Sequence, residues 1–196
     1  MSTQETFCCI CNGRLFDDFR GRANAKCKVC GSLERHRSFV LALLSLQVTS
    51  KTHVAILQPD ENAPRYTGYI ENLVPLRIIS ESDLRRDDME FDIIYHDHIL
   101  KTTFLGFESY GPLIAHVNRM LKPGASQLVS PAPMEALRGL LSESGGLVAS
   151  ADGGSYSLEL FDPVKNFGPD ISKSCVLRKA RNGVVSSNSI IMATRI

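Results

Sequence analysis

The amino-acid sequence predicts an α/β fold: a mostly parallel sheet that ends in antiparallel strands, preceded by a small cysteine-rich unit. Short apolar runs alternate with helical patterns through the middle of the chain, turn signals separate strand-like runs in the last third, and two cysteine pairs lie near the N-terminus. At 196 residues, the chain suits one main domain and a small appendage, since domains commonly span roughly 100–200 residues. We therefore expect a cysteine-rich unit over 6–31, a linking helix over 32–50 and an α/β domain over 51–196.

Two Cys-x-x-Cys pairs, separated by fifteen residues, have the spacing of a four-thiolate zinc ribbon. Each pair bends the chain so that its sulfurs converge, and two such turns complete a tetrahedron around the ion. Disulfides are a less suitable interpretation because the N-terminus carries no secretory signal, and a redox motif would not need two copies. The expected ligands of a structural zinc ion are Cys8, Cys11, Cys27 and Cys30.

The remaining cysteines receive different predictions. Cys8 and Cys9 are adjacent, so composition alone allows either as the first ligand, but only Cys8 leaves a two-residue loop before Cys11. Cys9 is therefore expected to be a spare thiol. Cys175 lies in an apolar setting and is expected to be a small core residue.

Charge and hydropathy exclude several classes of function. The net charge is +1, so no bulk field attracts nucleic acid; residues 1–38 hold seven Lys or Arg against four acids. This basic ribbon is either a solvated rim or a weak contact for nucleic acid or a protein partner. No apolar run approaches the roughly 20 residues that span a bilayer, and the absence of a signal peptide predicts a cytoplasmic location without membrane contact.

The first half of the chain contains one helix and three buried strands. Ser32 is expected to be the N-cap of a helix that continues to about Gln47, with Leu33, Phe39, Val40, Leu43 and Leu44 as its apolar stripe. The apolar runs 53–57, 76–80 and 91–95 are predicted strands, and 61–73 is ambiguous but compatible with a short helix.

The second half predicts a helix and then mainly strands. A helix over 110–121 is expected to end at Lys122-Pro123-Gly124, before a strand at 127–130. Two strands within 146–161 flank a turn at 152–154, and a second hairpin-like pairing joins 174–180 to 189–195. Alternating strands and helices favour a parallel sheet, to which these last strands add antiparallel members.

Three motifs carry a resemblance to a known family. The run Gly31-Ser32-Leu33-Glu34-Arg35-His36-Arg37 after the cysteines, the strand and loop over 91–100, and Val117 to Gly124 occur in this order. They resemble class I S-adenosylmethionine-dependent methyltransferases with an N-terminal zinc ribbon, which have a Rossmann-like sheet. The resemblance covers about residues 8–131 and implies that Arg35, His36 and Arg37 join the ribbon to the domain or line a substrate groove; surface salt bridges to Asp17 or Asp18 are the alternative.

The resemblance also implies a cofactor site at the carboxyl ends of the parallel strands. The turn after the first strand, Gln58-Pro59-Asp60, would approach the methionine and ribose of S-adenosylmethionine. Glu81 or Asp83 would hold the ribose hydroxyls. Asp97 and His98, in the loop after the 91–95 strand, would face the methyl group and an acceptor that the sequence does not identify.

The chain also departs from the family pattern. It has no glycine between Gly31 and Gly68, where a nucleotide-binding turn usually has one. Lys101-Thr102 replaces an acid-His pair, position 125 is Ala instead of a second glycine, and nine residues between Glu81 and Phe91 are too few for a complete βα unit. Two hypotheses therefore stay open: an S-adenosylmethionine-dependent methyltransferase, or a methyltransferase-like binding module without cofactor whose ribbon contacts protein or nucleic acid.

Overall fold

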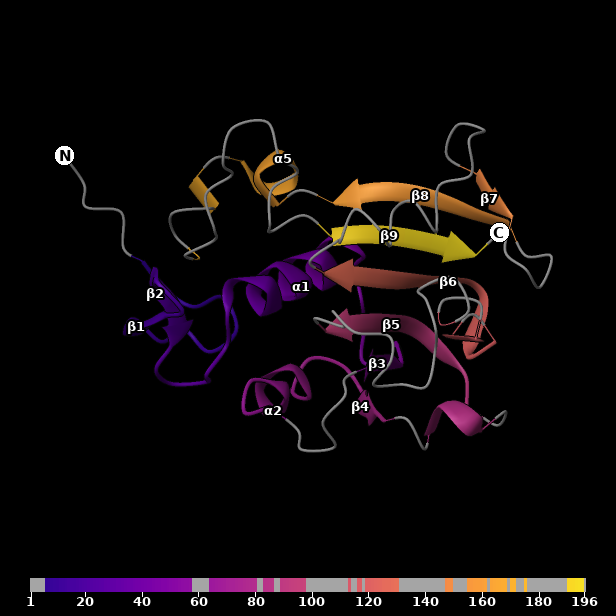
Figure 1. Ribbon diagram of the computed structural model, residues 1–196, viewed down its shortest axis with the longest axis horizontal. Coiled ribbons are helices and arrows are strands. Elements are labelled where there is room, and N and C mark those ends of the chain that lie inside the picture. Colours follow the sequence, from indigo (N-terminus) through magenta and orange to yellow (C-terminus); the bar gives the residue numbers. More distant parts are fainter. Residues whose placement is uncertain are drawn as a thin grey trace.

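The computed structural model describes residues 6–57, 64–80, 83–86, 89–97, 113, 116–117, 119–130, 147–149, 155–161, 163–168, 170–171, 175 and 190–195. Within these residues the chain forms a two-stranded sheet near the N-terminus and a seven-stranded sheet after it. Figure 1 places the small sheet beside the first turn of helix α1, which leads from it towards the large sheet.

The large sheet has the strand order β4-β3-β5-β6-β9-β8-β7. Its parallel half consists of β3 (Val54–Leu57), β4 (Leu76–Ile79), β5 (Phe91–Asp97) and β6 (Leu121–Ser130). Its antiparallel half consists of β7 (Leu147–Ala149), β8 (Ser155–Phe161) and β9 (Ile190–Arg195). The predicted fold class is confirmed: a Rossmann-like α/β sheet, mostly parallel, with antiparallel C-terminal strands.

Two apolar cores cover the two faces of this sheet. Alternate residues of β3 show why: Val54 and Ile56 belong to one core, whereas Ala55 and Leu57 belong to the other. Helix α1 (Glu34–Ser45) packs on the first face, where Phe39 stacks on Tyr95 of β5 with ring centroids 3.9 Å apart. A continuous apolar strand buried on both sides is typical of a parallel sheet covered on both faces.

The N-terminal unit is a hairpin of β1 (Phe16–Phe19) and β2 (Arg22–Cys27). Its cysteines are not a separate core. Cys8, Cys27 and Cys30 are fully buried and belong to the same apolar cluster as α1 and the first face of the sheet. The stability of the hairpin is therefore coupled to that of the sheet through shared buried surface.

The predicted start of the first helix is wrong by one residue. The N-cap is Leu33 and the helix begins at Glu34. Ser32 is fully buried and its hydroxyl contacts the sulfurs of Cys8 and Cys30, so it is not available to cap the helix. Leu44 is 51% exposed, so it does not belong to the buried stripe that includes Phe39.

The predicted boundary between the helix over 110–121 and the next strand is also wrong. Leu113, His116 and Val117 are helical, but β6 already begins at Leu121, which pairs with Phe91 of β5. The Lys122-Pro123-Gly124 run forms an irregularity in β6 instead of only ending a helix, with Gly124 at φ +75°. A proline is tolerated there because bulged positions need not donate to the ladder.

The expected pairing of 189–195 with 174–180 is contradicted. One edge of β9 pairs with β6 and its other edge pairs with β8, and a strand has only two edges. The expected hairpin within 146–161 is confirmed by β7 and β8, which pair antiparallel. β7 and β8 are consecutive in the sequence and pair with each other, whereas β9 lies between β6 and β8 in the sheet.

Short elements complete the described chain. They are α2 (Thr67–Ile70), the 3₁₀ turn η1 (Asp83–Arg85) and α5 (Pro163–Phe167). Between β4 and β5, η1 stands where a full helix and strand would otherwise lie, as the short spacing predicts. Within the described residues, no helix is both long enough and apolar enough to cross a bilayer.

Candidate functional site

The four predicted zinc ligands come together in one cluster. Their sulfurs all lie within 4.8 Å of one another, with 3.7 Å between Cys8 and Cys30 and 3.6 Å between Cys11 and Cys27. A tetrahedron with metal–sulfur bonds of about 2.3 Å has sulfur–sulfur edges of about 3.8 Å, whereas a disulfide needs about 2.05 Å. The geometry of the four thiols therefore fits a tetrahedral metal ion and does not fit two disulfides.

The backbone explains how each pair converges. The residue after each second cysteine adopts a positive φ: Asn12 at 59° and Gly31 at 73°. Backbone N–H groups close both turns, from Asn12 to the Cys8 carbonyl at 2.7 Å and from Gly31 to the Cys27 carbonyl at 2.9 Å. Asn and Gly tolerate this left-handed conformation better than other residues. The two Cys-x-x-Cys turns therefore share the same backbone conformation although the residues between and after their cysteines differ.

The electrostatics of the cluster favour a thiolate at Cys8. Hydrogen bonding from Cys30 lowers the pKa of Cys8 to about 4, against the effect of burial and with help from Ser32. Donation to Cys8, followed by burial, raises the pKa of Cys30. Metals bind thiolates rather than thiols, and the hydrogen bond between Cys8 and Cys30 stabilises a thiolate within this pair.

A second layer of contacts holds these ligands in place. The Ser32 hydroxyl lies 3.3 Å from the sulfur of Cys8 and 3.2 Å from that of Cys30. The fully buried Arg37 donates to the Ser32 carbonyl at 3.0 Å and to the Ala25 carbonyl of β2 at 3.0 Å. Such outer contacts orient metal ligands, and here they also link α1 to the hairpin.

The signature run from Gly31 to Arg37 is therefore explained by docking. Besides Arg37, Glu34 accepts a hydrogen bond from Arg22 at 2.7 Å while being almost fully buried. His36 stacks on Tyr66 with ring centroids 4.0 Å apart. These contacts favour the ribbon-to-domain role over a substrate groove; Asp17 pairs instead with Lys28, at 3.0 Å.

The second candidate region is the edge at which the parallel strands end. The chain runs from β3 to β4 on one side and then to β5 on the other side of β3, so β3 and β5 flank a topological switch point. Ligands of open α/β sheets bind outside the carboxyl ends of strands at such a point. The carboxyl ends of the four parallel strands meet here because all four run the same way.

Most of the predicted cofactor and catalytic residues fall outside the described part of the chain. The structure describes the backbone of Asp97, the last residue of β5, and it describes Asp83. The positions expected at this edge that lie outside the described residues are Gln58, Pro59, Asp60, Glu81 and His98. Their roles stay predictions, and so does that of Asp97.

Asp83 has a local structural role. Its carboxylate accepts the Ser80 N–H at 3.1 Å and hydroxyl at 3.2 Å, and it pairs with Arg77 at 3.1 Å. Partial burial would raise the pKa of Asp83, but these donors together lower it. The carboxylate is therefore an anion that connects η1 to Ser80 and to Arg77 of β4. Its predicted contact with a ribose would have to use its remaining acceptor positions.

The sequence did not identify the pair formed by His96 and Gln127. His96 is 1% exposed, and its Nε2 lies 2.8 Å from Gln127 Oε1 across β5 and β6. Burial lowers the pKa of His96 to about 4, despite this hydrogen bond, so the ring is neutral at pH 7. The pair fixes the spacing of β5 and β6 next to Asp97. Alternation along β5 was the available signal, since it places His96 on the same face as the buried Ile94.

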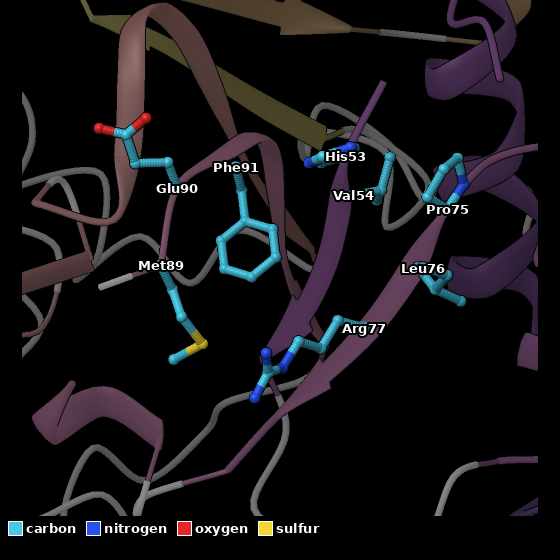
Figure 2. A pocket seen from close by; sticks show the side chains of 8 residues that line it. All are labelled: His53, Val54, Pro75, Leu76, Arg77, Met89, Glu90 and Phe91. Atoms are coloured by element: carbon cyan, nitrogen blue, oxygen red, sulfur yellow. The ribbon is translucent and has the colours of Figure 1, made fainter. Parts of the chain in front are cut away.

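The described residues also line a pocket of about 390 Å³ at the opposite edge of the sheet. Its walls gather where β3, β4 and β5 begin, as Figure 2 shows with His53, Arg77 and Glu90. This is the amino edge of the parallel strands, the wrong edge for a ligand at a switch point. We therefore do not assign the predicted cofactor site to this pocket.

Near that edge, Asp92 of β5 contacts the residue before β3 and a residue of β6. Its carboxylate makes a pH-dependent contribution to the free energy of unfolding. Its carboxylate accepts the His53 N–H at 2.8 Å and binds the Lys122 ammonium at 3.0 Å. Partial burial raises the pKa of Asp92, but these contacts outweigh burial and lower it. The stabilisation is present above the unfolded pKa of about 3.9 and is lost as the pH falls through the lower folded pKa.

We expect Asp92→Asn to lower the free energy of unfolding by about 1 kcal/mol at pH 7. The difference from the unmodified protein should shrink as the pH falls below the unfolded pKa and through the lower folded pKa of Asp92, because the wild-type carboxylate then becomes protonated. Urea unfolding at pH 7 and at a series of acidic pH values measures this. Asp17→Asn is the control because Asp17 is exposed with its partner Lys28; an Asp92 effect that is independent of pH would contradict the assignment.

Comparisons with known proteins give structural likenesses only. No protein-family model matches the chain, and no curated protein matches it. The chain is similar to phosphoethanolamine N-methyltransferase 2 of Haemonchus contortus, solved with phosphomonomethylethanolamine and S-adenosylhomocysteine, at 10% identity and a TM-score of 0.43. That likeness covers 82% of this chain but 36% of the methyltransferase, so this chain spans little more than a third of its length.

Two further solved structures are similar to this chain. The YcgJ protein of Bacillus subtilis has 13% identity and a TM-score of 0.43, with 82% of this chain and 98% of that chain covered. The tRNA (m1A58) methyltransferase TrmI of Aquifex aeolicus has 12% identity and a TM-score of 0.44, with 89% and 73% covered.

Proposed function

We propose that the protein is an S-adenosylmethionine-dependent methyltransferase whose N-terminal unit is a structural zinc ribbon. The observation that carries the proposal is the switch point between β3 and β5, because the resemblance places the cofactor contacts at the carboxyl ends of these strands. The motif over 91–100 is compatible with it, since Phe91–Asp97 forms β5 and brings Asp97 to that edge.

Within this proposal, the role of each site residue depends on which strand it follows. Methyl transfer from a sulfonium is an in-line displacement, which needs mainly positioning of the two reactants. Gln58, Pro59 and Asp60 would contact the cofactor after β3, and Glu81 or Asp83 would hold its ribose. Asp97 and His98 would face the acceptor, with His98 available as a base.

We infer that the four-cysteine cluster holds zinc. Sulfur–sulfur distances of 3.6 and 3.7 Å match a tetrahedral thiolate site, and the contacts of Ser32 and Arg37 give its ligands an outer layer. The ion would act structurally, since four protein ligands leave no open position. The ribbon would then help to recognise the acceptor, whose identity is open, or a nucleic-acid or protein partner.

A cytoplasmic location is part of the proposal. All six cysteines are unpaired, and thiols persist where the compartment is reducing. A zinc site of four thiolates needs the same condition because oxidation of its sulfurs releases the ion.

Calorimetric titration of the zinc-loaded protein with S-adenosylmethionine and S-adenosylhomocysteine tests the proposed activity. We expect micromolar affinity, and at least a tenfold loss on Asp60→Asn, because Asp60 is a proposed cofactor contact and a lost hydrogen bond of about 1.4 kcal/mol changes a dissociation constant tenfold. Glu90→Gln is the matched control: Glu90 precedes the amino end of β5 and lines the amino-edge pocket.

The two variants separate the possible results. Loss on Glu90→Gln with none on Asp60→Asn would move the ligand to the amino edge and contradict the proposed site. Absence of heat at millimolar ligand would reject the methyltransferase and support the alternative, a binding module without cofactor.

A further inference from the structure

The N-terminal unit presents exposed cations around two exposed apolar side chains. Leu15 is 66% exposed and Val29 is 40% exposed. The Lys28 N–H donates to the Leu15 carbonyl at 3.0 Å, so the chain segments that carry these two side chains adjoin. We call this surface the ribbon face, and its six residues, all exposed, are Leu15, Arg20, Lys26, Lys28, Val29 and Arg65.

The pairing of the hairpin places its lysines on the outer side. Lys26 lies opposite Asp17 in the pairing of β1 with β2, and its neighbours Ala25 and Cys27 are fully buried. Because side chains alternate along a strand, Lys26 points away from the core. Lys28 binds Asp17 at 3.0 Å, but the two side chains are 50% and 55% exposed. Such a pair stabilises by at most about 1 kcal/mol, so a phosphate can replace the carboxylate.

Arg65 extends the ribbon face onto the α/β domain. It lies between β3 and α2, and its Nη2 donates to the Val29 carbonyl at 3.0 Å, which uses only part of its five N–H donors. Figure 1 shows the hairpin and α2 on the side of the large sheet towards which the arrowheads of β5 and β6 point. This is the carboxyl edge, at which the proposed methyl transfer would occur.

The tip of the hairpin adds groups that stack. The guanidinium carbons of Arg20 and Arg22 lie 5.4 and 5.7 Å from the centroid of the Phe19 ring. Guanidinium planes and aromatic rings stack on unpaired bases, and exposed cations bind phosphates. A duplex keeps its bases stacked inside, and an acidic polypeptide offers carboxylates at irregular intervals. A single strand supplies both phosphates and flat apolar groups, which are the two kinds of group that this surface fits.

We propose that the ribbon face binds single-stranded nucleic acid. Its four cations contact phosphates, whereas its two apolar side chains pack against bases or sugars. The inference rests on the proposed function, since it names the class of acceptor that would reach the carboxyl edge. The binding itself needs no cofactor.

Fluorescence anisotropy of the zinc-loaded full chain tests the proposal, with labelled oligouridylate and oligothymidylate of about 15 nucleotides. One phosphate contact for each of the four cations gives a slope of about −3 for the logarithm of the association constant against that of the salt concentration. Affinity should therefore fall roughly 50-fold between about 50 and 200 mM salt. Equal binding of both strands supports the shared chemistry, and tighter binding of one identifies RNA or DNA as its source.

Two matched pairs of substitutions locate the contact. Lys26→Gln with Lys28→Gln should reduce the slope to about −1.5 and weaken binding at least about tenfold at low salt. Lys51→Gln with Lys165→Gln removes the same charge from exposed positions outside the ribbon face and should leave both values unchanged. Zinc content and the thermal midpoint should stay those of the unmodified protein in both cases, because all four lysines are exposed.

Three results would overturn the proposal. The first is no change in anisotropy at low salt with the unmodified protein, which needs no variant to fold. The second is an equal loss from both pairs of substitutions. The third is displacement of the oligonucleotide by poly-glutamate as effectively as by unlabelled oligonucleotide, which would make an acidic polypeptide the partner. Since these measurements omit S-adenosylmethionine, their outcome is independent of the calorimetric titration that tests the proposed function.

Discussion

Cys27→Ser should remove zinc from the protein and lower the stability of the sheet as well as of the hairpin. Structural zinc in small four-ligand sites contributes an apparent binding energy of about 10–16 kcal/mol, and a serine hydroxyl does not replace a thiolate. Cys27 is fully buried in the core that contains Val54 and Tyr95. We expect zinc content to fall to near zero and the thermal midpoint to drop by at least about 20 °C, since each kcal/mol shifts it roughly 2–4 °C at this size.

The matched control is Cys9→Ser, which changes a cysteine next to a ligand but outside the cluster. It should keep a full equivalent of zinc, measured by atomic absorption, and nearly the same midpoint. Among the described residues, the second core, around Leu57 and Ile94, contains none from the hairpin, so Cys27→Ser should retain most of its strand signal in circular dichroism. Loss of zinc from Cys9→Ser instead would mean that the ligand set is wrong.

Arg37→Met should lower the free energy of unfolding by about 3 kcal/mol, because two charge-assisted hydrogen bonds of about 1.5 kcal/mol each are lost. The Arg37 guanidinium donates to the carbonyls of Ser32 and Ala25, and it stacks 5.3 Å from the ring centroid of Phe16. Methionine fills similar length without any donor, so the Ala25 carbonyl loses this partner. Urea unfolding with excess zinc measures the change.

The neighbouring Arg35→Met is the control, since Arg35 is only half-buried and should change the free energy by less than about 1 kcal/mol. Zinc should also leave Arg37→Met faster when a chelator is added, because Ser32 loses its own support. A neutral Arg37→Met would show that the desolvation of a buried charge cancels its hydrogen bonds, contrary to the docking role.

Local patterns in the sequence were sufficient for the parallel half of the fold. The runs that became β3, β4 and β5 are short and rich in apolar and β-branched residues, which favour strands, although in β4 only Ile79 is buried. The Cys-x-x-Cys spacing likewise identified the cluster, because the knuckle turn is local and its two sulfurs converge within four residues.

Properties that depend on distant partners were not predictable. Ser32 has the character of an N-cap, but the sulfurs of Cys8 and Cys30 approach its hydroxyl only in the folded chain. The buried His96–Gln127 pair is equally invisible to periodicity. Lys122-Pro123-Gly124 predicted a helix end, yet its pairing with β5 placed it in a strand.

The place of β9 between β6 and β8 has a consequence for synthesis on the ribosome. β8 is connected to the parallel strands through β9, which pairs with both β6 and β8. β7 and β8 therefore cannot join the sheet until residues 190–195 have emerged. Until then β6 exposes an unpaired edge, which is a template for aggregation. Contacts between segments so far apart also slow folding. A nascent chain stalled before Ile190 should therefore be a target for chaperones, and its release should coincide with closure of the sheet.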